Sequence, residues 1–138
     1  MERNRTPLAS FLRSPRRVFA FDAFGAALSV LLNGVVVMAL REWFGFPRPV
    51  LLVTAAVPLL FIAYDLLSFR FGRGREVGLL RGIAFLNLGY CLLVITLAVL
   101  HRDELTGLGW AYAAGEVLVV ATIAQLELVV AKGLTMNR

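Results

Sequence analysis

Two acidic residues interrupt the last long apolar segment of the chain. Glu116 and Glu127 are eleven residues apart, which on an α-helix is three turns plus about 20°, so both lie on one face. A carboxyl group in hydrocarbon is costly and typically marks a proton relay, an ion pathway or a ligand site. No Lys or Arg falls at the depth expected for Glu116. We therefore expect its carboxyl group to be protonated or to face water.

Neutral groups on other segments can serve Glu116 as partners. Asn33 and Thr96 fall at its expected depth, and Tyr90 lies on the polar face of the third apolar segment. These four residues are our candidates for a proton or ligand site: Glu116, Asn33, Thr96 and Tyr90. A structural role stays open, in which a protonated Glu116 bonds Asn33 or a backbone carbonyl and simply joins two helices.

A second group of charges lies near the opposite ends of the apolar segments. We predict an inner polar network of four residues: Asp22, Asp65, Arg81 and Glu127. One interpretation is a satisfied ion-pair network, because long cationic side chains near helix ends extend toward the interface. The other is a proton or cation site, because three carboxyl groups face one embedded arginine. A catalytic acid pair of Asp22 with Asp65 has no companion motif to support it.

The eleven-residue spacing recurs on other segments. Asp22 and Asn33 share one face of the first segment, and Thr54 and Asp65 share one face of the second. Hydrocarbon offers such side chains no hydrogen-bond partners, so the polar stripes are expected to face one another. The sequence therefore predicts helices packed around a partly polar interior.

The segments that carry these residues are long enough to cross a membrane. Hydrophobic residues make up 59% of the 138-residue chain, against about 45–50% in soluble domains. They concentrate in four segments of at least about 20 residues, the length of a spanning helix: 18–40, 50–69, 79–100 and 108–131. Backbone groups in hydrocarbon must be paired within helices, and short connectors make neighbouring helices antiparallel. We predict an all-α, integral membrane, four-helix up-down-up-down bundle.

The chain divides into a short basic segment and one membrane domain. Residues 1–17 form the basic N-terminal segment. Two interpretations stay open for it: a helix beginning at Thr6-Pro7 and ending at Pro15 that lies on the membrane surface, or a disordered tail held near anionic lipid by its five arginines. Residues 18–138 form the four-span domain. Within it, Pro58 removes one helix hydrogen bond and leaves the carbonyl group of Thr54 free, so a bend is expected there.

The basic residues predict the orientation of the bundle. Of fourteen, three flank one side of the predicted spans: Arg41, Arg48 and Arg102. The other eleven lie on the side of both termini, which the positive-inside rule assigns to the cytoplasm. Trp43 and Trp110 fall on the outer side, where aromatic belts form. We predict N-in and C-in, in a bacterial inner membrane. The formal charge of +5 is explained by this asymmetry, so nucleic acid is not an expected partner.

No motif in the sequence names a reaction. The phosphate-binding, dinucleotide-binding, zinc-binding and serine-hydrolase patterns are not found, so we assign no catalytic residue, cofactor or metal ligand. An enzyme acting on a lipid or quinone is the least favoured reading. The leading reading is a non-catalytic accessory subunit that binds a larger membrane partner, with its arginine-rich segments on anionic lipid. The alternative is a proton-coupled transporter of an ion or small molecule, acting as a homo-oligomer with Glu116 as the protonatable site.

Overall fold

The computed structural model describes residue 10 and residues 13–136, and this part of the chain is helical without β-strands. Its helical elements are α2 (Pro15–Leu31), η1 (Leu32–Val37), α3 (Arg41–Phe44), α4 (Arg48–Phe71), α5 (Glu76–Leu100) and α6 (Gly107–Met136). The surface helix expected between Thr6 and Pro15 falls mostly outside the described residues. Pro15 itself is the first residue of α2, a position where its missing N–H has no helix partner to lose.

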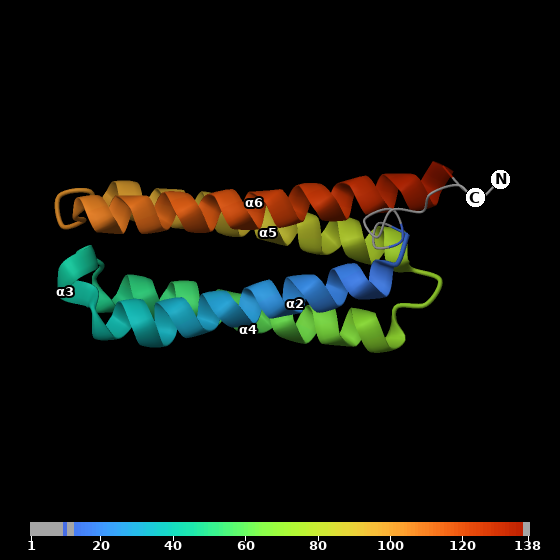
Figure 1. Ribbon diagram of the computed structural model, residues 1–138, viewed down its shortest axis with the longest axis horizontal. Coiled ribbons are helices and arrows are strands. Elements are labelled where there is room, and N and C mark those ends of the chain that lie inside the picture. The colour runs from blue at the N-terminus through green and yellow to red at the C-terminus, as the bar shows by residue number, and fades with distance from the viewer. Residues whose placement is uncertain (1–9, 11–12, 137–138) are drawn as a thin grey trace.

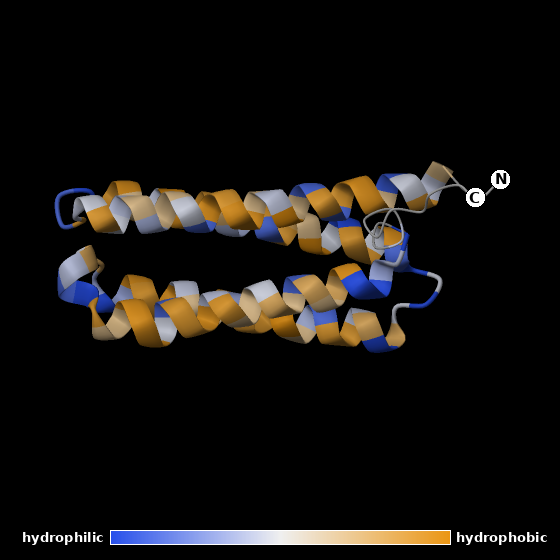
Figure 2. Cartoon of the chain, in the orientation of Figure 1, coloured by the Kyte–Doolittle hydropathy of each residue, from blue (hydrophilic) through white to orange (hydrophobic). Residues whose placement is uncertain are grey.

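Four of the described helices are long and apolar enough to cross a membrane. They span Pro15–Val37 (α2 with η1), Arg48–Phe71, Glu76–Leu100 and Gly107–Met136, with mean hydropathies between 1.8 and 2.4. Hydrophobic residues run along all four helices, whereas hydrophilic residues gather in the connectors at the two ends (Figure 2). The chain therefore has the properties of a small helical membrane protein.

The four long helices pack as two pairs. The first hairpin (residues 15–71) places α2 and η1 against α4, and the second hairpin (residues 76–136) places α5 against α6 (Figure 1). Contacts between the two hairpins are far fewer than those within them. We call the end that carries the α4–α5 connector the arginine end, and the end that carries α3 the tryptophan end. Each hairpin is therefore a packing unit, and a smaller set of contacts joins the two.

At the tryptophan end, the backbone of α3 docks onto the start of α6. The Thr106 hydroxyl donates to the Trp43 carbonyl oxygen at 2.7 Å and accepts the Gly109 N–H at 3.1 Å. Thr106 thereby satisfies one of the free N–H groups at the start of α6, as a helix N-cap does. Gly109 leaves room for this contact, because a Cβ atom there would overlap the Phe44 carbonyl oxygen. This close approach fixes one end of the hairpin interface.

The first spanning helix changes its winding where it reaches the tryptophan half of the bundle. Six residues, Leu32–Val37, form the π-helical turn η1, in which each carbonyl pairs one residue further along than in an α-helix. Asn33 and Val37 are the buried residues of this turn. Gly34 lies against Ala55 of α4, where a Cβ atom would approach the Ala55 Cβ to 3.4 Å. The wide turn thus packs closely on α4 while Asn33 enters the interior.

Candidate functional site

The two hairpins are connected by polar side chains that lie between them. Seven polar or charged residues are buried: Asp22, Asn33, Thr54, Asp65, Ser68, Asn87 and Glu127. Several bond across the interface, and two groups of residues result. We name them the Glu116 cluster (Asn33, Thr54, Tyr90, Tyr112 and Glu116) and the acid cluster (Asp22, Asp65, Asn87 and Glu127). Because each polar face turns to the other hairpin, the aliphatic faces are left for lipid.

In the Glu116 cluster, neutral donors surround one carboxyl group. Asn33 of η1 donates through Nδ2 to Glu116 Oε1 at 2.7 Å. The Tyr90 hydroxyl of α5 lies 2.9 Å from the same oxygen, and Ser29 of α2 lies close enough to interact with it. The first of the four long helices (α2 with η1) and the third (α5) thus converge on the Glu116 side chain, which comes from the fourth, α6.

The Tyr90 hydroxyl has one hydrogen but two acceptors. It lies 2.9 Å from Glu116 Oε1 and 2.9 Å from the Thr54 carbonyl oxygen. A backbone carbonyl can only accept, so a Tyr90 hydroxyl that donates to Thr54 has no hydrogen left for Glu116. If the Glu116 carboxyl group carries a proton, it can donate to Tyr90 while Tyr90 donates to Thr54, and both short contacts are then full hydrogen bonds.

The Thr54 carbonyl group is free to accept because of Pro58. In an α-helix the residue four positions later donates to each carbonyl, and proline has no N–H to donate. Pro58 lies inside the uninterrupted helix α4, and the Tyr90 hydroxyl takes the place of the missing donor. A bond supplied from the second hairpin thus completes the backbone of the first.

Asn33 is held in place from its other side. Tyr112 donates from its hydroxyl to Asn33 Oδ1 at 3.1 Å, which leaves the Asn33 amide nitrogen pointing at Glu116. The Tyr112 ring packs edge-on against Phe44 and Phe46, with ring centres 5.6 and 6.2 Å away. Tyr112 is not among the residues singled out from the sequence. The sequence does place Tyr112 one helical turn before Glu116, and residues four apart share a helix face. This spacing alone indicates that Tyr112 faces the same interior region as Glu116.

Thr96 lies apart from the other candidates. Its side chain is exposed, and its hydroxyl donates to the Leu92 carbonyl oxygen at 2.7 Å within α5. It makes no contact with Glu116, unlike Asn33 and Tyr90. A hydroxyl on a lipid-facing surface satisfies itself in this way, through the carbonyl one turn earlier.

The acid cluster places three carboxyl groups around one amide. Asn87 of α5 donates through Nδ2 to Asp22 Oδ2 at 2.9 Å and to Glu127 Oε2 at 3.3 Å. The Asp22 carboxyl group also lies within hydrogen-bonding range of the carboxyl groups of Asp65 and Glu127. Asp22, Asp65 and Glu127 are 2%, 0% and 0% exposed, so all three carboxyl groups lie in the interior. Neither carboxyl oxygen of Asp65 has a hydrogen-bond donor among the described residues.

The fourth member of the predicted inner network points elsewhere. Arg81 is exposed at the arginine end of α5, while the three acids lie inside. Among the described residues, the ion pairs are His101 with Glu104 and Arg102 with Asp103, both in the α5–α6 connector. The structure therefore brings the predicted acids together without their predicted arginine.

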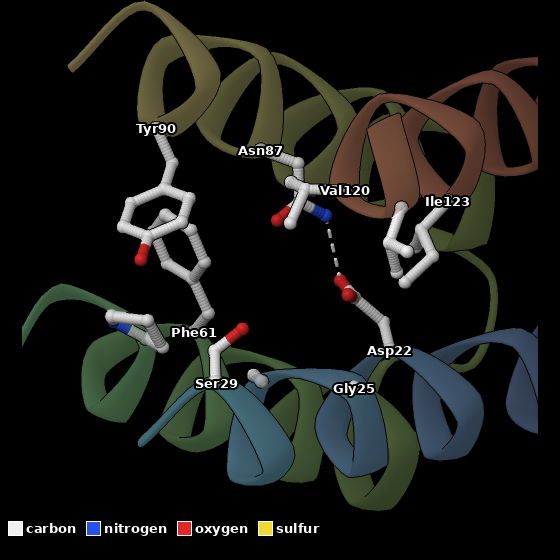
Figure 3. A pocket seen from close by; sticks show the side chains of 11 residues that line it. Asp22, Gly25, Ser29, Phe61, Asn87, Tyr90, Val120 and Ile123 are labelled. Carbon is white, nitrogen blue, oxygen red and sulfur yellow. Dashed lines mark hydrogen bonds between the residues drawn. The ribbon is translucent and has the colours of Figure 1, made fainter. Parts of the chain in front are cut away.

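A small cavity separates the two clusters. It has a volume of about 20 Å³, which is room for about one water molecule. Asp22 and Asn87 line it on the side of the acid cluster, and Ser29 and Tyr90 line it on the side of the Glu116 cluster (Figure 3). Polar groups thus follow one another from one cluster to the other along the hairpin interface.

His101 and Cys91 belong to neither cluster. The His101 Nδ1 atom is 2.9 Å from Glu104 Oε1 in the connector, and the buried Cys91 thiol faces the Val117 carbonyl oxygen at 3.6 Å. Among the described residues, no three His, Cys, Asp or Glu side chains are arranged to hold a metal ion.

Chemically, the interface offers carboxyl groups that exchange protons, hydroxyl groups that relay them, and amides that orient both. A comparison with family models, curated proteins and solved structures finds no match for this chain.

Proposed function

We propose that this chain is a proton-coupled membrane transport protein in which Glu116 binds and releases the coupling proton. In this proposal the bundle lies up-down-up-down in a bacterial inner membrane, with the arginine end in the cytoplasm. The arginine end carries the connector residues Arg73 and Arg75 and the exposed Arg81, which favours this orientation by the positive-inside rule.

The observation that carries the proposal is the pair of acceptors around the Tyr90 hydroxyl. With Glu116 protonated, Tyr90 donates to the Thr54 carbonyl and every group is paired. When Glu116 loses its proton, the carboxylate competes for the single Tyr90 hydrogen, and charged acceptors form the stronger hydrogen bonds. The Thr54 carbonyl then loses its donor at the point where Pro58 already weakens α4. Proton release at Glu116 is thereby coupled to the shape of the first hairpin.

Such coupling gives a transporter the two conformations that it needs. Contacts between the hairpins are far fewer than those within them, so a change in the polar contacts can shift one hairpin against the other. The interior cavity accommodates about one water molecule, which is enough for a proton but not for a larger solute. Any solute is therefore expected to pass along a surface shared with a second copy of the chain, as in a homo-oligomer.

Proton flux into proteoliposomes tests the proposal. Native protein is expected to dissipate an imposed pH gradient, and Glu116→Gln is expected to abolish that flux while remaining folded, because an amide can replace a protonated carboxyl group as donor to Tyr90. Glu42→Gln is the matched control, since Glu42 is an exposed glutamate of α3. Equal flux from the native protein and Glu116→Gln would refute the role of Glu116.

A non-catalytic accessory subunit is the second candidate, and the small interior favours it. The cavity near Glu116 is too small for a solute, and the contacts of Glu116 with Asn33 and Tyr90 also serve to fasten two helices. This role predicts that purification in mild detergent recovers a larger membrane protein in a fixed ratio. Recovery of the chain alone from native membranes would argue against it.

A further inference from the structure

The acid cluster differs from the Glu116 cluster in one respect, which is a shortage of donors. Asn87 supplies two amide hydrogens, and its contacts direct them to Asp22 and Glu127. Neither oxygen of Asp65 receives a hydrogen bond from an N–H group or from a Ser, Thr or Tyr hydroxyl. A carboxylate that is completely buried without a donor or a cation is among the most costly arrangements in a protein.

The missing hydrogens are supplied if the cluster holds protons. Asp22 lies within hydrogen-bonding range of Asp65 on one side and of Glu127 on the other. A contact between two carboxyl groups is a hydrogen bond only when one of them carries a proton. Two protons satisfy both contacts, give Asp65 its partner, and leave a single negative charge that the Asn87 amide can bond.

Among residues 13–136, no basic side chain forms an ion pair with Asp65. Three titratable groups interact electrostatically with the Asp65 carboxyl group: Asp22 of α2, Tyr64 of α4 and Glu127 of α6. Each of them is an acid. The Tyr64 hydroxyl is engaged with the Leu79 carbonyl oxygen at 2.9 Å. The basic side chains near this end of the helices are exposed: Arg16, Arg17, Arg70, Arg81 and Lys132. Among these, the Arg16 guanidinium donates to the Phe69 carbonyl oxygen at 3.1 Å.

We propose that Asp22, Asp65 and Glu127 form a second proton-binding site, at the arginine end of the hairpin interface, which exchanges protons with Glu116 through the intervening cavity. Asp65 is the residue whose pairing depends on the stored proton, and Asn87 orients Asp22 and Glu127. A water in the cavity would have Asp22 and Asn87 on one side and Ser29 and Tyr90 on the other, the polar partners that an interior water requires. The ligand is a proton, because the three carboxyl groups are not arranged as metal ligands.

Each step of this exchange is a proton transfer without redox change. A protonated carboxyl group of the acid cluster gives its proton to the cavity water, which passes one to the Tyr90 hydroxyl, and the Tyr90 hydroxyl hydrogen moves to the Glu116 carboxylate. The acid cluster loses one positive charge and Glu116 gains one. The exchange rests on the proposed function, whereas the presence of stored protons at Asp65 does not.

Infrared spectroscopy of the protein in lipid nanodiscs tests the second site directly. At neutral pH the native protein is expected to show the carbonyl stretching band of protonated carboxylic acids, and Asp65→Asn is expected to remove part of its intensity. The new amide can donate to Asp22, so this variant is expected to fold, as thermal unfolding and gel filtration will verify. Asp103→Asn is the control, because Asp103 is exposed in the α5–α6 connector, and it is expected to leave the band unchanged.

Two further arms make the result decisive. If Asp65→Asn does not give folded protein, Glu127→Gln takes its place with the same expected loss of intensity. Replacing choline chloride by sodium chloride at constant ionic strength is expected to leave the band unaltered. A band that Asp65→Asn and Glu127→Gln leave intact, or one that sodium removes, would overturn the proton-binding site.

The same variants separate this proposal from the proposed function. An Asp65-dependent band in a protein without proton flux would support the second site and contradict transport. Flux that Glu116→Gln abolishes, with a band that neither Asp65→Asn nor Glu127→Gln changes, would support transport and overturn the second site. Loss of both the band intensity and most of the flux in Asp65→Asn is the result expected if protons pass between the two clusters.

Discussion

The Tyr90 hydroxyl lies 2.9 Å from the Thr54 carbonyl oxygen, the acceptor that Pro58 leaves without a helix donor. This bond joins α5 to α4, and hence one hairpin to the other. The same hydroxyl lies 2.9 Å from Glu116 Oε1, so two acceptors compete for its single hydrogen. The structure of the first hairpin and the proton on Glu116 are consequently linked through one hydroxyl group.

Removal of the Tyr90 hydroxyl should therefore destabilise the fold. Tyr90→Phe leaves the buried Thr54 carbonyl without its donor and removes one of the contacts of Glu116, which keeps its bond from Asn33. An unpaired buried polar group costs about 1–3 kcal/mol. We expect a loss of this size in the free energy of unfolding, measured by denaturant titration in detergent micelles. Tyr64→Phe is the control, because it removes a bond to the Leu79 carbonyl oxygen, which lies inside α5 and has a helix donor of its own, so it should cost less. An equal or smaller cost for Tyr90→Phe would contradict the role given to the Thr54 contact.

The contribution of Pro58 can be isolated with a double-mutant cycle. Pro58→Ala restores an N–H group that can donate to Thr54, so the loss of the Tyr90 hydroxyl should matter less in that background. We expect Tyr90→Phe to cost about 1 kcal/mol less when combined with Pro58→Ala, within the range of coupling between contacting residues. Identical costs in the two backgrounds would mean that Tyr90 does not substitute for the missing helix donor.

Because α3 docks onto α6, the same Gly→Ala substitution should have opposite effects on stability at two positions of α6. Gly109→Ala places a Cβ atom against the Phe44 carbonyl oxygen, and overpacking of this kind costs about 1–3 kcal/mol. Gly115→Ala, two turns further along α6, meets open space and should stabilise the helix by up to about 1 kcal/mol. Thermal unfolding of the two variants is expected to shift in opposite directions. A destabilising Gly115→Ala with a neutral Gly109→Ala would be inconsistent with the close contact.

Cysteine labelling tests the orientation in the membrane. In a Cys91→Ala background, Arg102→Cys in the α5–α6 connector should react with a membrane-impermeant maleimide added to intact cells. Arg73→Cys in the α4–α5 connector should react only after the membrane is permeabilised. The reverse pattern would place the arginine end outside and contradict the orientation that the positive-inside rule predicts.

The sequence was informative about which residues lie in the interior, because lipid imposes a simple rule. Hydrocarbon offers no partners to Asn33, Asp65 or Glu116, so their helix faces had to turn inward. The free carbonyl of Thr54 also followed from the position of Pro58 alone. Helix faces and missing backbone donors are local properties, and a single sequence contains them.

Pairings between helices were beyond the sequence because they depend on packing. Periodicity gives the direction of each polar stripe, but it does not say that α2 pairs with α4, or that Asn87 lies between Asp22 and Glu127. Arg81 shares a helix with Asn87, yet its long flexible side chain turns to the exterior, where the charge stays solvated. Thr96 lies on an exposed face of α5, six residues beyond the Tyr90 that reaches Glu116, and neither its face nor its level relative to α6 can be derived from the order of residues alone. The π-helical turn at Leu32–Val37 has no sequence signature that we recognise.

Infrared spectroscopy of Glu116 tests the central claim most directly. If the single Tyr90 hydrogen belongs to Thr54, the Glu116 carboxyl group carries a proton at neutral pH. A difference spectrum between the native protein and Glu116→Gln in nanodiscs should then contain the carbonyl band of a protonated carboxylic acid. A difference spectrum with only the bands of an ionised carboxylate would show that Glu116 is charged in this fold, and would contradict the proton-linked contact between the hairpins.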